Sequence, residues 1–471
     1  MNTLDIVIRL VYLAAATCFV LGLHLMNSPV TARRGNILSA AGMAAAVAAT
    51  LVLLVDSGTV SGTGWIVLGS GAAIGTVAGW YFARTVAMTA MPQLVSLFNA
   101  VGGGAAALVA VHDFVRLTGA HAQVPTRIAV ATVLDVIIGS ITFSGSLIAS
   151  GKLQGIVTSR PVVFPGARVV NAVLASVTIG GAAFVATGAD SVVLLAVVAA
   201  AALASGVAIV MPIGGADMPV VISLLNAFTG TAVAMAGFVI GNTVLVIAGA
   251  LVGASGGILT KLMADAMNRS VVNILMGGFG TGDSVSAVAG PGGQVRAVSA
   301  DDAAIQLAYA SKVVIVPGYG LAAAQAQHEV RELADLLEER GVEVTYAIHP
   351  VAGRMPGHMN VLLAEANVPY AQLKEMDEAN QEFGRADVAL VIGANDVINP
   401  AARRPGNPVS GMPILDVDHA RSVIVIKRSM GHGYAGIDNE LYTDPKTGMF
   451  FADARKGLAE LAAAIKVLVG G

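Results

Sequence analysis

The chain is divided into two chemically unlike parts, and the first can be stable only in a lipid bilayer. An apolar, glycine-rich block runs to about Lys261, and a charged segment begins at about Gly290. Charged residues make up 12% of the chain, about half the share found in ordinary soluble domains. The sequence therefore predicts an integral membrane domain with a soluble domain attached to its C-terminal end.

The apolar block contains nine segments close to the length of about 20 residues that a helix needs to cross the hydrocarbon core. They lie at about residues 4–26, 36–55, 63–83, 93–111, 128–149, 168–187, 191–211, 219–240 and 243–264. The first segment is too long for the apolar core of a signal peptide, so we expect it to remain in the mature protein. We predict a helical membrane domain over 1–270, a linker over 271–295 and an α/β domain over 296–471.

An odd number of spans puts the two termini on opposite sides of the membrane. With the N-terminus outside, eight basic residues fall in the inside loops and flanks, and only Arg116 and Arg127 fall outside. The positive-inside rule favours this arrangement and predicts a cytoplasmic C-terminal domain. The residues after Arg269 carry 16 bases and 23 acids, a formal charge of −7 that provides no electrostatic footprint for nucleic acid.

Ionisable and amide side chains inside a membrane are costly, so each is a candidate for function. Asn99 and Asn226 both lie about two turns after a Met-Pro pair in otherwise similar segments. They could place two amides in one polar pathway, or each could bond only to a neighbouring helix. Asp135 lies deep in its span, whereas Asp217 precedes a helix and could serve only to complement the helix dipole.

The soluble segment alternates short β-branched runs with amphipathic helices, which predicts a Rossmann-like parallel sheet with crossover helices. The predicted strands are Val313–Val316, Val342–Ile348, Val388–Ile392, Ile414–Val417 and Val423–Ile426. The first strand ends at a glycine turn, Gly318-Tyr319-Gly320. We expect one helix to follow it, with a polar face that carries Gln325, His328, Glu329, Arg331 and Glu332. Such a turn lets backbone N–H groups approach a pyrophosphate.

The sequence also favours NADP(H) over NAD(H) as the ligand. NAD-binding folds usually place an acid at the end of the second strand to hold the ribose 2′-hydroxyl, but this chain has Ile348-His349-Pro350 there. Lys427-Arg428-Ser429 follow the last predicted strand, at the edge where such sheets bind ligands. They precede a glycine-rich run, Met430 to Gly436, that could close as a lid. The alternative for the basic pair is a solvated loop end.

No metal or disulfide chemistry is indicated. His349, His358 and His432 do not show the spacing of a metal site, and Cys18 is the only cysteine. The sequence therefore predicts neither a metal centre nor a disulfide framework.

Several motifs resemble those of the β subunit of proton-translocating NAD(P) transhydrogenase. These motifs are Gly318 to Gly320, Val351 to Asn360, Gly393 to Val397, Lys427 to Met430, Gly214 to Asn226 and Ala266 to Ser270. The resemblance covers essentially the whole chain. It implies a proton-translocating membrane domain fused to a domain that binds NADP(H) in the reverse orientation to most dinucleotide folds.

The resemblance also implies which residues contact the cofactor. They are Gly318, Tyr319, Gly320, Val351, Ala352, Gly353, Arg354, Met355, Pro356, Gly393, Ala394, Asn395, Asp396, Val397, Met412, Pro413, Lys427, Arg428, Ser429, Met430, Gly431, His432, Gly433, Tyr434, Asp453 and Ala454. Asp396, Asn395 and Tyr434 are expected to act in catalysis. Asp396 matches an acid near the nicotinamide that links protonation to cofactor affinity, and Tyr434 matches the lid residue.

A proton pathway is implied through Asn99, Asp217, Asn226, Arg269 and Ser270. Asn99 departs from the family pattern, because some members have a proton-conducting histidine at this position. The titrating group is then expected elsewhere, for example on a partner subunit.

The function predicted from the resemblance is coupling of hydride transfer between NADH and NADP⁺ to proton movement across the bacterial inner membrane. The chain shows one dinucleotide domain, so an alpha subunit that binds NAD(H) is expected as partner, in a dimer of heteromers embedded in membrane lipid. The alternative is a channel or transporter gated by NADP(H), although the sequence contains no selectivity-filter motif.

Overall fold

The computed structural model describes the chain except for residues 1–2, 27–28, 88–89, 121–123, 159–160, 164, 189–190, 215–216, 268–269, 273, 275–294, 354–356, 407–408, 434, 436 and 470–471. Most of the linker expected over 271–295 thus lies outside the described residues. The chain forms two compact units, one mainly of Met1–Ile213 and Val221–Thr260 and the other mainly of Thr281–Gly471.

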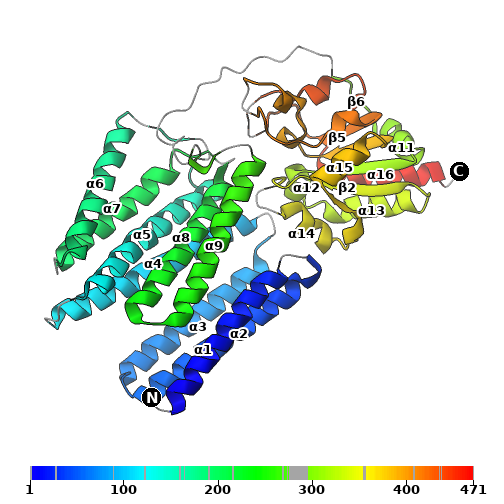
Figure 1. Cartoon of the computed structure of the whole chain (residues 1–471). Helices are drawn as coiled ribbons and strands as arrows, with labels where there is room; N and C mark the ends of the chain where they lie inside the picture. The colour runs from blue at the N-terminus through cyan, green and yellow to red at the C-terminus, as the bar shows by residue number, and fades with distance from the viewer. Residues whose placement is uncertain are drawn as a thin grey trace. The chain divides into compact units, whose positions relative to one another are not determined.

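In the described part of the first unit, nine helices are long and apolar enough to cross a membrane (Figure 1). They are α1 (Thr3–Leu25), α2 (Pro29–Ser57), α3 (Gly62–Thr85), α4 (Met91–Gly119), α5 (Thr126–Gln154), α6 (Ala167–Ala186), α7 (Val192–Val210), α8 (Met218–Ile240) and α9 (Thr243–Ala266). The nine predicted spans are confirmed. Helices α2, α4 and α5 have 29 residues each, a length of about 43 Å, and so extend beyond the core of about 30 Å.

Small residues bring α4 and α5 into close contact. A Cβ on Gly103 would lie 2.8 Å from the Cβ of Thr142, and a Cβ on Gly139 would overlap the carbonyl oxygen of Gly103. Without a hydrophobic force between helices in lipid, such close backbone packing supplies much of the association energy. The glycines at this contact therefore determine how tightly the two helices pack.

The second unit is built on a six-stranded parallel sheet with the strand order β3-β2-β1-β4-β5-β6. The strands are β1 (Lys312–Pro317), β2 (Glu343–Ile348), β3 (Leu373–Glu375), β4 (Val388–Ile392), β5 (Ser422–Lys427) and β6 (Thr447–Phe451). The chain leaves β1 towards β2 on one side and later returns to β4 on the other. The carboxyl ends of β1 and β4 therefore flank a topological switch point, where such sheets bind ligands.

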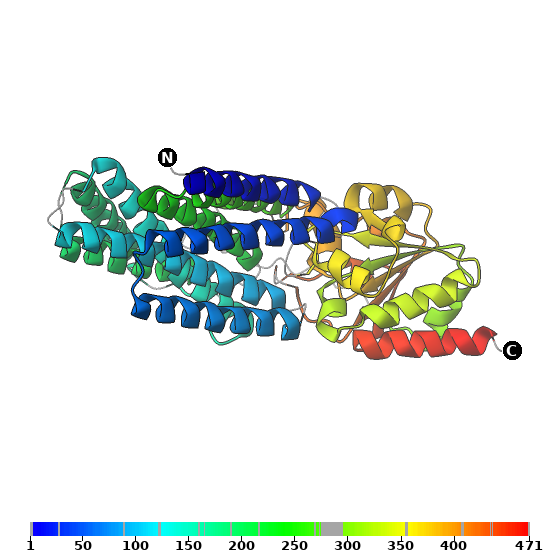
Figure 2. The same ribbon diagram turned by 90° about the horizontal axis from the view of Figure 1, so that it is seen from below.

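Helices cover both faces of this sheet (Figure 2). On one face α11 (Ala300–Ala308) and α13 (Gln327–Glu338) pack against α16 (Ala454–Val469). On the other face, Ala379 and Phe383 of α15 (Met376–Phe383) join a buried cluster with strand residues such as Val391. The α/β class expected from the sequence is confirmed.

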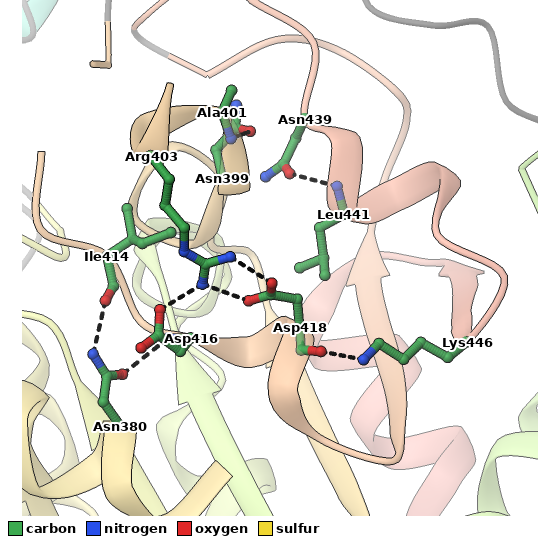
Figure 3. Close-up of polar contacts among 10 residues, drawn as sticks. All are labelled: Asn380, Asn399, Ala401, Arg403, Ile414, Asp416, Asp418, Asn439, Leu441 and Lys446. Atoms are coloured by element: carbon green, nitrogen blue, oxygen red, sulfur yellow. Dashed lines mark hydrogen bonds and ion pairs between the residues drawn. The ribbon is translucent and has the colours of Figure 1, made fainter. Parts of the chain in front are cut away.

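One predicted strand is wrong. Residues Ile414–Val417 form an irregular segment rather than a strand, although Ile414, Leu415 and Val417 are all buried. The side chain of Asn380 donates to Ile414 O at 3.0 Å and accepts from the Asp416 N–H at 2.9 Å (Figure 3). The Asn380 side-chain amide thus provides hydrogen bonds that a neighbouring strand would otherwise provide. The buried segment Ile414–Val417 therefore does not need to pair with a strand.

The helix expected after the glycine turn is divided in two. Helix α12 (Tyr319–Ala324) ends at Gln325, whose backbone lies in the left-handed region at φ 51°, and α13 begins at Gln327. The Ala326 N–H donates back to Leu321 O at 3.1 Å. This C-terminal cap interrupts a pattern that the sequence presents as one continuous helix.

Candidate functional site

A cleft of about 480 Å³ lies at the carboxyl ends of β1, β4 and β5. Its walls come from the loops after these strands, the loop after β2 and the start of α16. The described residues that line it are Gly318, Tyr319, Gly320, Ala323, Ala324, Val351, Ala352, Gly353, Gly393, Ala394, Asn395, Asp396, Val397, Ile426, Lys427, Arg428, Ser429, Gly431, His432, Gly433, Ala452, Asp453 and Ala454. The volume is within the range of about 300–1,000 Å³ typical of small-molecule sites.

Glycines allow the loops after β1 and β4 to pack backbone against backbone. The Gly318 N–H donates to Ile392 O at 2.9 Å, and the Gly320 N–H donates to Gly393 O at 3.0 Å. A Cβ on Gly320 would lie 2.6 Å from the Cα of Gly393, whose own φ is +66°. These two N–H groups therefore bond within the protein, whereas the sequence pattern suggested that they would face a pyrophosphate.

Asp396 lies beneath the glycine-rich loop that follows β5. The Ala435 N–H donates to Asp396 Oδ2 at 3.1 Å, and a Cβ on Gly433 would overlap the Asp396 carboxylate. Only glycine permits this approach of the loop to the acid. Tyr434, which the sequence placed in this loop as a catalytic residue, lies outside the described residues.

Lys427 ends β5 and points its ammonium group at two different partners. Its Nζ donates to Gly431 O at 2.5 Å and lies 4.6 Å from the centre of the Tyr442 ring, a cation–π contact. Burial lowers the pKa of Lys427, and the negative charge of Asp396 opposes this shift. Arg428 follows it and is exposed.

Tyr442 and Asn439, which the sequence analysis did not identify, hold the Asn395 loop in place. The buried Tyr442 hydroxyl lies 3.0 Å from both Ala394 O and Asn395 Oδ1. The Asn439 amide donates to Asn395 O at 2.9 Å. Burial raises the pKa of Tyr442, so its hydroxyl keeps its proton and acts as a donor. Because these bonds join segments more than 40 residues apart, no local motif signals them.

His349 connects the loop after β2 to the Met412-Pro413 segment. The Val351 N–H donates to His349 Nδ1 at 3.2 Å, which leaves Nε2 to carry the proton and donate to Pro413 O at 2.8 Å. Burial lowers the pKa of His349, and the bond to Pro413 opposes the shift. Met412 and Pro413 were predicted to contact a cofactor, but among the described lining residues neither occurs.

The sequence-predicted cofactor residues thus fall into three groups. Most of those from the loops after β1, β2, β4 and β5, together with Asp453 and Ala454, line one cleft. Met412, Pro413 and Met430 are described but are not among its lining residues. Arg354, Met355, Pro356 and Tyr434 lie outside the described residues. The sequence analysis missed the lining residues Ala323, Ala324, Ile426 and Ala452, whose small or apolar side chains carry no recognisable motif.

In the membrane unit, Asn99 and Asn226 are brought close to each other. The buried Asn99 side chain donates to Ile222 O at 3.2 Å, one helical turn before Asn226 on α8. The Thr229 hydroxyl donates to Asn99 O at 3.2 Å. The Asn99 amide therefore contacts α8 one helical turn from Asn226.

The other residues predicted for the proton pathway are placed differently. Asp217 is 9% exposed and lies immediately before α8, where its N–H donates to Gly214 O. Ser270 is exposed and its carbonyl accepts from the Ile274 N–H at 3.1 Å. Arg269 lies outside the described residues.

The chemistry of the soluble cleft fits a phosphorylated dinucleotide. Lys427, Arg428 and Ser429 supply two cations and a hydroxyl at one place, and Asp396 and Asn395 supply a carboxylate and an amide at another. Cations with a hydroxyl are typical ligands of a phosphate monoester. Gly320 and Gly393 line the same cleft and pack backbone against backbone without any side chain.

Comparison with known proteins gives a result that covers nearly the whole chain. Residues 8–464 match the model of the family described as NAD(P) transhydrogenase beta subunit. Two sequences of NAD(P) transhydrogenase subunit beta from Rhodospirillum rubrum are each 49% identical to this chain over 464 residues, which cover 96% of this chain and 98% of the relative.

Proposed function

Because the chain belongs to the NAD(P) transhydrogenase beta subunit family, we propose that its soluble cleft binds NADP(H) and that its membrane helices carry the protons. The chain is a subunit of proton-translocating NAD(P) transhydrogenase. We assign proton translocation to residues 1–270 and NADP(H) binding to residues 296–471. The observation that carries this assignment is that the basic group at Lys427 and the acid Asp396 line one cleft at the switch point of the sheet.

NADP(H) would supply the hydride chemistry through its nicotinamide ring. Hydride transfer between two nicotinamides is nearly isoenergetic, so the task of this chain is to position one of them and to exclude water. Net transfer in one direction needs an external drive. One proton moving down the membrane potential supplies about 2.3 kcal/mol per 100 mV, which shifts an equilibrium by about fiftyfold.

Lys427, Arg428 and Ser429 would hold the 2′-phosphate. An ammonium group has three donors, and Lys427 directs one of them at Gly431 O. Arg428 is exposed beside it and can form a bidentate contact with a phosphate. This pair explains selectivity for NADP(H), since NAD(H) presents a hydroxyl where NADP(H) presents a dianion.

Asp396 would link protonation to the state of the lid loop. Its carboxylate accepts from the Ala435 N–H and favours the charged form of Lys427. Protonation of Asp396 would weaken both effects together, loosening the loop and lowering the positive charge available to a phosphate. Asn395, held by Tyr442 and Asn439, would orient the nicotinamide end, and Tyr434 would close over it.

The alpha subunit is the partner implied by this family, and we propose that it contributes the NAD(H) site. The distribution of basic residues supports a cytoplasmic soluble domain. We further propose a dimer of heteromers, located in the bacterial inner membrane and surrounded by lipid.

The test uses membrane vesicles that contain the full chain with its alpha subunit. Addition of NADH and NADP⁺ should produce hydride transfer together with proton movement, detected by a pH-sensitive dye. Omission of either nucleotide should abolish both signals. If NADP(H) alone opened a proton leak and no hydride were transferred, the chain would act as a gated channel and the proposal would fail.

A further inference from the structure

A polar seam runs along the contact between α4 and α5. On α5, the residues Thr132, Asp135, Gly139, Thr142 and Ser146 recur every three or four positions and therefore share one helix face. This face lies against α4, as the contacts of Gly139 and Thr142 with Gly103 demonstrate. We call this contact between α4 and α5, to which these five residues of α5 belong, the seam.

Towards the C-terminal end of α5 several polar groups of the seam have hydrogen-bond partners, although the Ser146 hydroxyl and Gln93 Oε1 are buried without a partner among the described residues. The Ser96 hydroxyl of α4 donates to Ser146 O at 2.8 Å, and the Ser150 hydroxyl of α5 donates to Gln93 O at 3.2 Å. The Thr142 hydroxyl donates to Ile138 O within its own helix. The neighbouring Asn99 amide is also paired, with Ile222 O. Partners that account for burial are therefore present for the hydroxyls of Ser96, Thr142 and Ser150 and for the Asn99 amide.

Asp135 is different. It is fully buried, and neither of its carboxyl oxygens forms a hydrogen bond with a described residue. The hydroxyl of Thr132, one turn away on the same face, is likewise buried without a partner among the described residues. Asp135 lies five residues before the midpoint of α5, about 8 Å along the axis, and so within the hydrocarbon core. A carboxyl group in such a place usually serves an ion or proton pathway.

The other ionisable side chains of the described membrane helices do not share this position. Among the ionisable side chains of the described membrane helices, only those of Asp135 and Lys152 are wholly buried. Unlike Asp135, Lys152 has partners, because its Nζ donates to Ile213 O at 2.7 Å and to Met211 O. Helices α7 and α8, which pack against α5, contain no ionisable side chain. The remaining ionisable groups on α5 and its neighbours α4 and α6 are Arg127, His112, Asp113, Arg116 and Arg168.

These remaining groups do not neutralise Asp135. Asp113 is paired with Arg116 at 2.7 Å, and His112, Arg127 and Arg168 are exposed on the chain. No ion pair joins Asp135 to any residue that the structure describes. Among the described residues, the carboxyl group of Asp135 thus has neither a counter-ion nor a hydrogen-bond donor, and it is buried near one end of the polar seam.

We propose that Asp135 is a proton-carrying residue of the translocation pathway and that the α4–α5 seam conducts protons to and from it. The inference rests on the proposed function and adds to it a residue outside the pathway set out above. An O–H bond forms on a carboxyl oxygen of Asp135 when a proton arrives, and the same bond breaks when the proton leaves. The seam between Ser146 and Asp135 spans 11 residues, about 17 Å along α5, which is about half of a hydrocarbon core of about 30 Å.

The experiment compares three variants of the full chain in vesicles with its alpha subunit. Asp135→Asn removes the titrating group while keeping its size, and Asp135→Glu keeps the carboxyl. Asp113→Asn is the matched control, because it makes the same chemical change on α4 at a residue paired with Arg116. Protons moved per hydride transferred, the pH profile of proton movement and NADP(H) binding are measured for each.

The proposal predicts that Asp135→Asn lowers proton movement at least tenfold, whereas Asp113→Asn stays within twofold of the unmodified protein. Asp135→Glu should retain proton movement with a shifted pH profile. Equal proton movement in Asp135→Asn and Asp113→Asn would overturn the proposal. If the Asp135→Asn variant does not insert into the membrane, the Asp135→Glu variant decides the question. A pH profile of proton movement that is unshifted in Asp135→Glu would also overturn the proposal. Absence of proton movement in the unmodified protein would instead refute the proposed function.

Discussion

At the scale of single residues, Tyr442 contacts two cleft residues from different loops, Lys427 and Asn395. Its ring supports the Lys427 ammonium at 4.6 Å, and its hydroxyl contacts Asn395 Oδ1 and Ala394 O. A change at either residue can therefore reach the other through one rigid, buried side chain. Sequence reasoning identified Lys427 and Asn395 but not this connection, because Tyr442 belongs to a loop with no motif.

Tyr442→Phe should destabilise the soluble unit and weaken NADP(H) binding. The ring and its contact with Lys427 remain, but Ala394 O loses its donor, whereas Asn395 Oδ1 still accepts from the Asn439 amide at 3.2 Å. A buried polar group left unsatisfied costs about 1–3 kcal/mol. Thermal unfolding and an NADPH titration of the complex measure the two effects.

The control for this substitution is Tyr309→Phe, which removes the hydroxyl of an 83% exposed side chain and should leave both measurements unchanged. If Tyr442→Phe bound NADPH as tightly as the unmodified protein and unfolded at the same temperature, the connecting role of Tyr442 would be wrong.

Lys427→Gln should lower the affinity for NADP(H) by about tenfold or more, since a hydrogen bond to a charged group contributes about 1.5–3 kcal/mol. Because burial lowers the pKa of Lys427, its ammonium loses its proton at a lower pH than a free lysine. Affinity that depends on this charge should be greatest at lower pH and fall as the pH rises through the lowered pKa. Titrations over a range of alkaline pH test this, and a decline of equal size in Lys427→Gln would contradict it.

At the scale of helices, strands and loops, the elements predicted correctly from the sequence are those that the pattern of apolar residues determines. The nine predicted spans and four of the predicted strands are correct, because long apolar segments and runs of β-branched residues directly indicate buried helices and strands. The buried segment Ile414–Val417 forms hydrogen bonds with the Asn380 side chain instead of pairing with a strand, which no local pattern reveals. Strands β3 and β6 were missed, and β3 has only three residues.

The neighbouring loop residues are also fixed by long-range contacts. Arg403 pairs with Asp416 at 2.5 Å and with Asp418 at 2.6 Å, and the Lys446 side chain donates to Asp418 O (Figure 3). These bonds hold the loop that leads from β4 to β5. Their partners lie 13 to 28 residues apart, so a sequence pattern cannot assign them.

In the glycine-rich loop that follows β5, Gly433 lies against the Asp396 carboxylate. Gly433→Ala should displace the loop from Asp396, because the added Cβ would overlap the carboxylate. We expect the affinity for NADP(H) to fall at least severalfold, with a faster release of the nucleotide. Stopped-flow release of NADPH from the complex measures this change.

Gly431→Ala is the matched control in the same loop. Its Cβ would lie 3.6 Å from the Ser429 hydroxyl, an ordinary contact, so release should remain close to that of the unmodified protein. Equal effects of the two substitutions would show that the loop tolerates no side chain anywhere, and would remove the specific role given to the contact with Asp396.

At the scale of the whole molecule, two units with different chemistry must act together. The membrane unit contains buried polar groups, including Asp135 and Asn99, and the soluble unit contains the cleft with Lys427 and Asp396. The sequence predicted both units from composition and periodicity. The arrangement of the polar seam depends on which faces of α4 and α5 meet, and composition alone does not specify this.

The central claim is that protonation changes how tightly the soluble unit holds NADP(H). Linkage makes this quantitative, because uptake or release of one proton with the nucleotide changes its affinity by about tenfold per pH unit. The direct measurement is the dissociation constant of NADPH, and separately of NADP⁺, for the complete complex in membranes over a range of pH. The account predicts a slope approaching one decade per pH unit for at least one of the two nucleotides. Affinities of both that are independent of pH would contradict it.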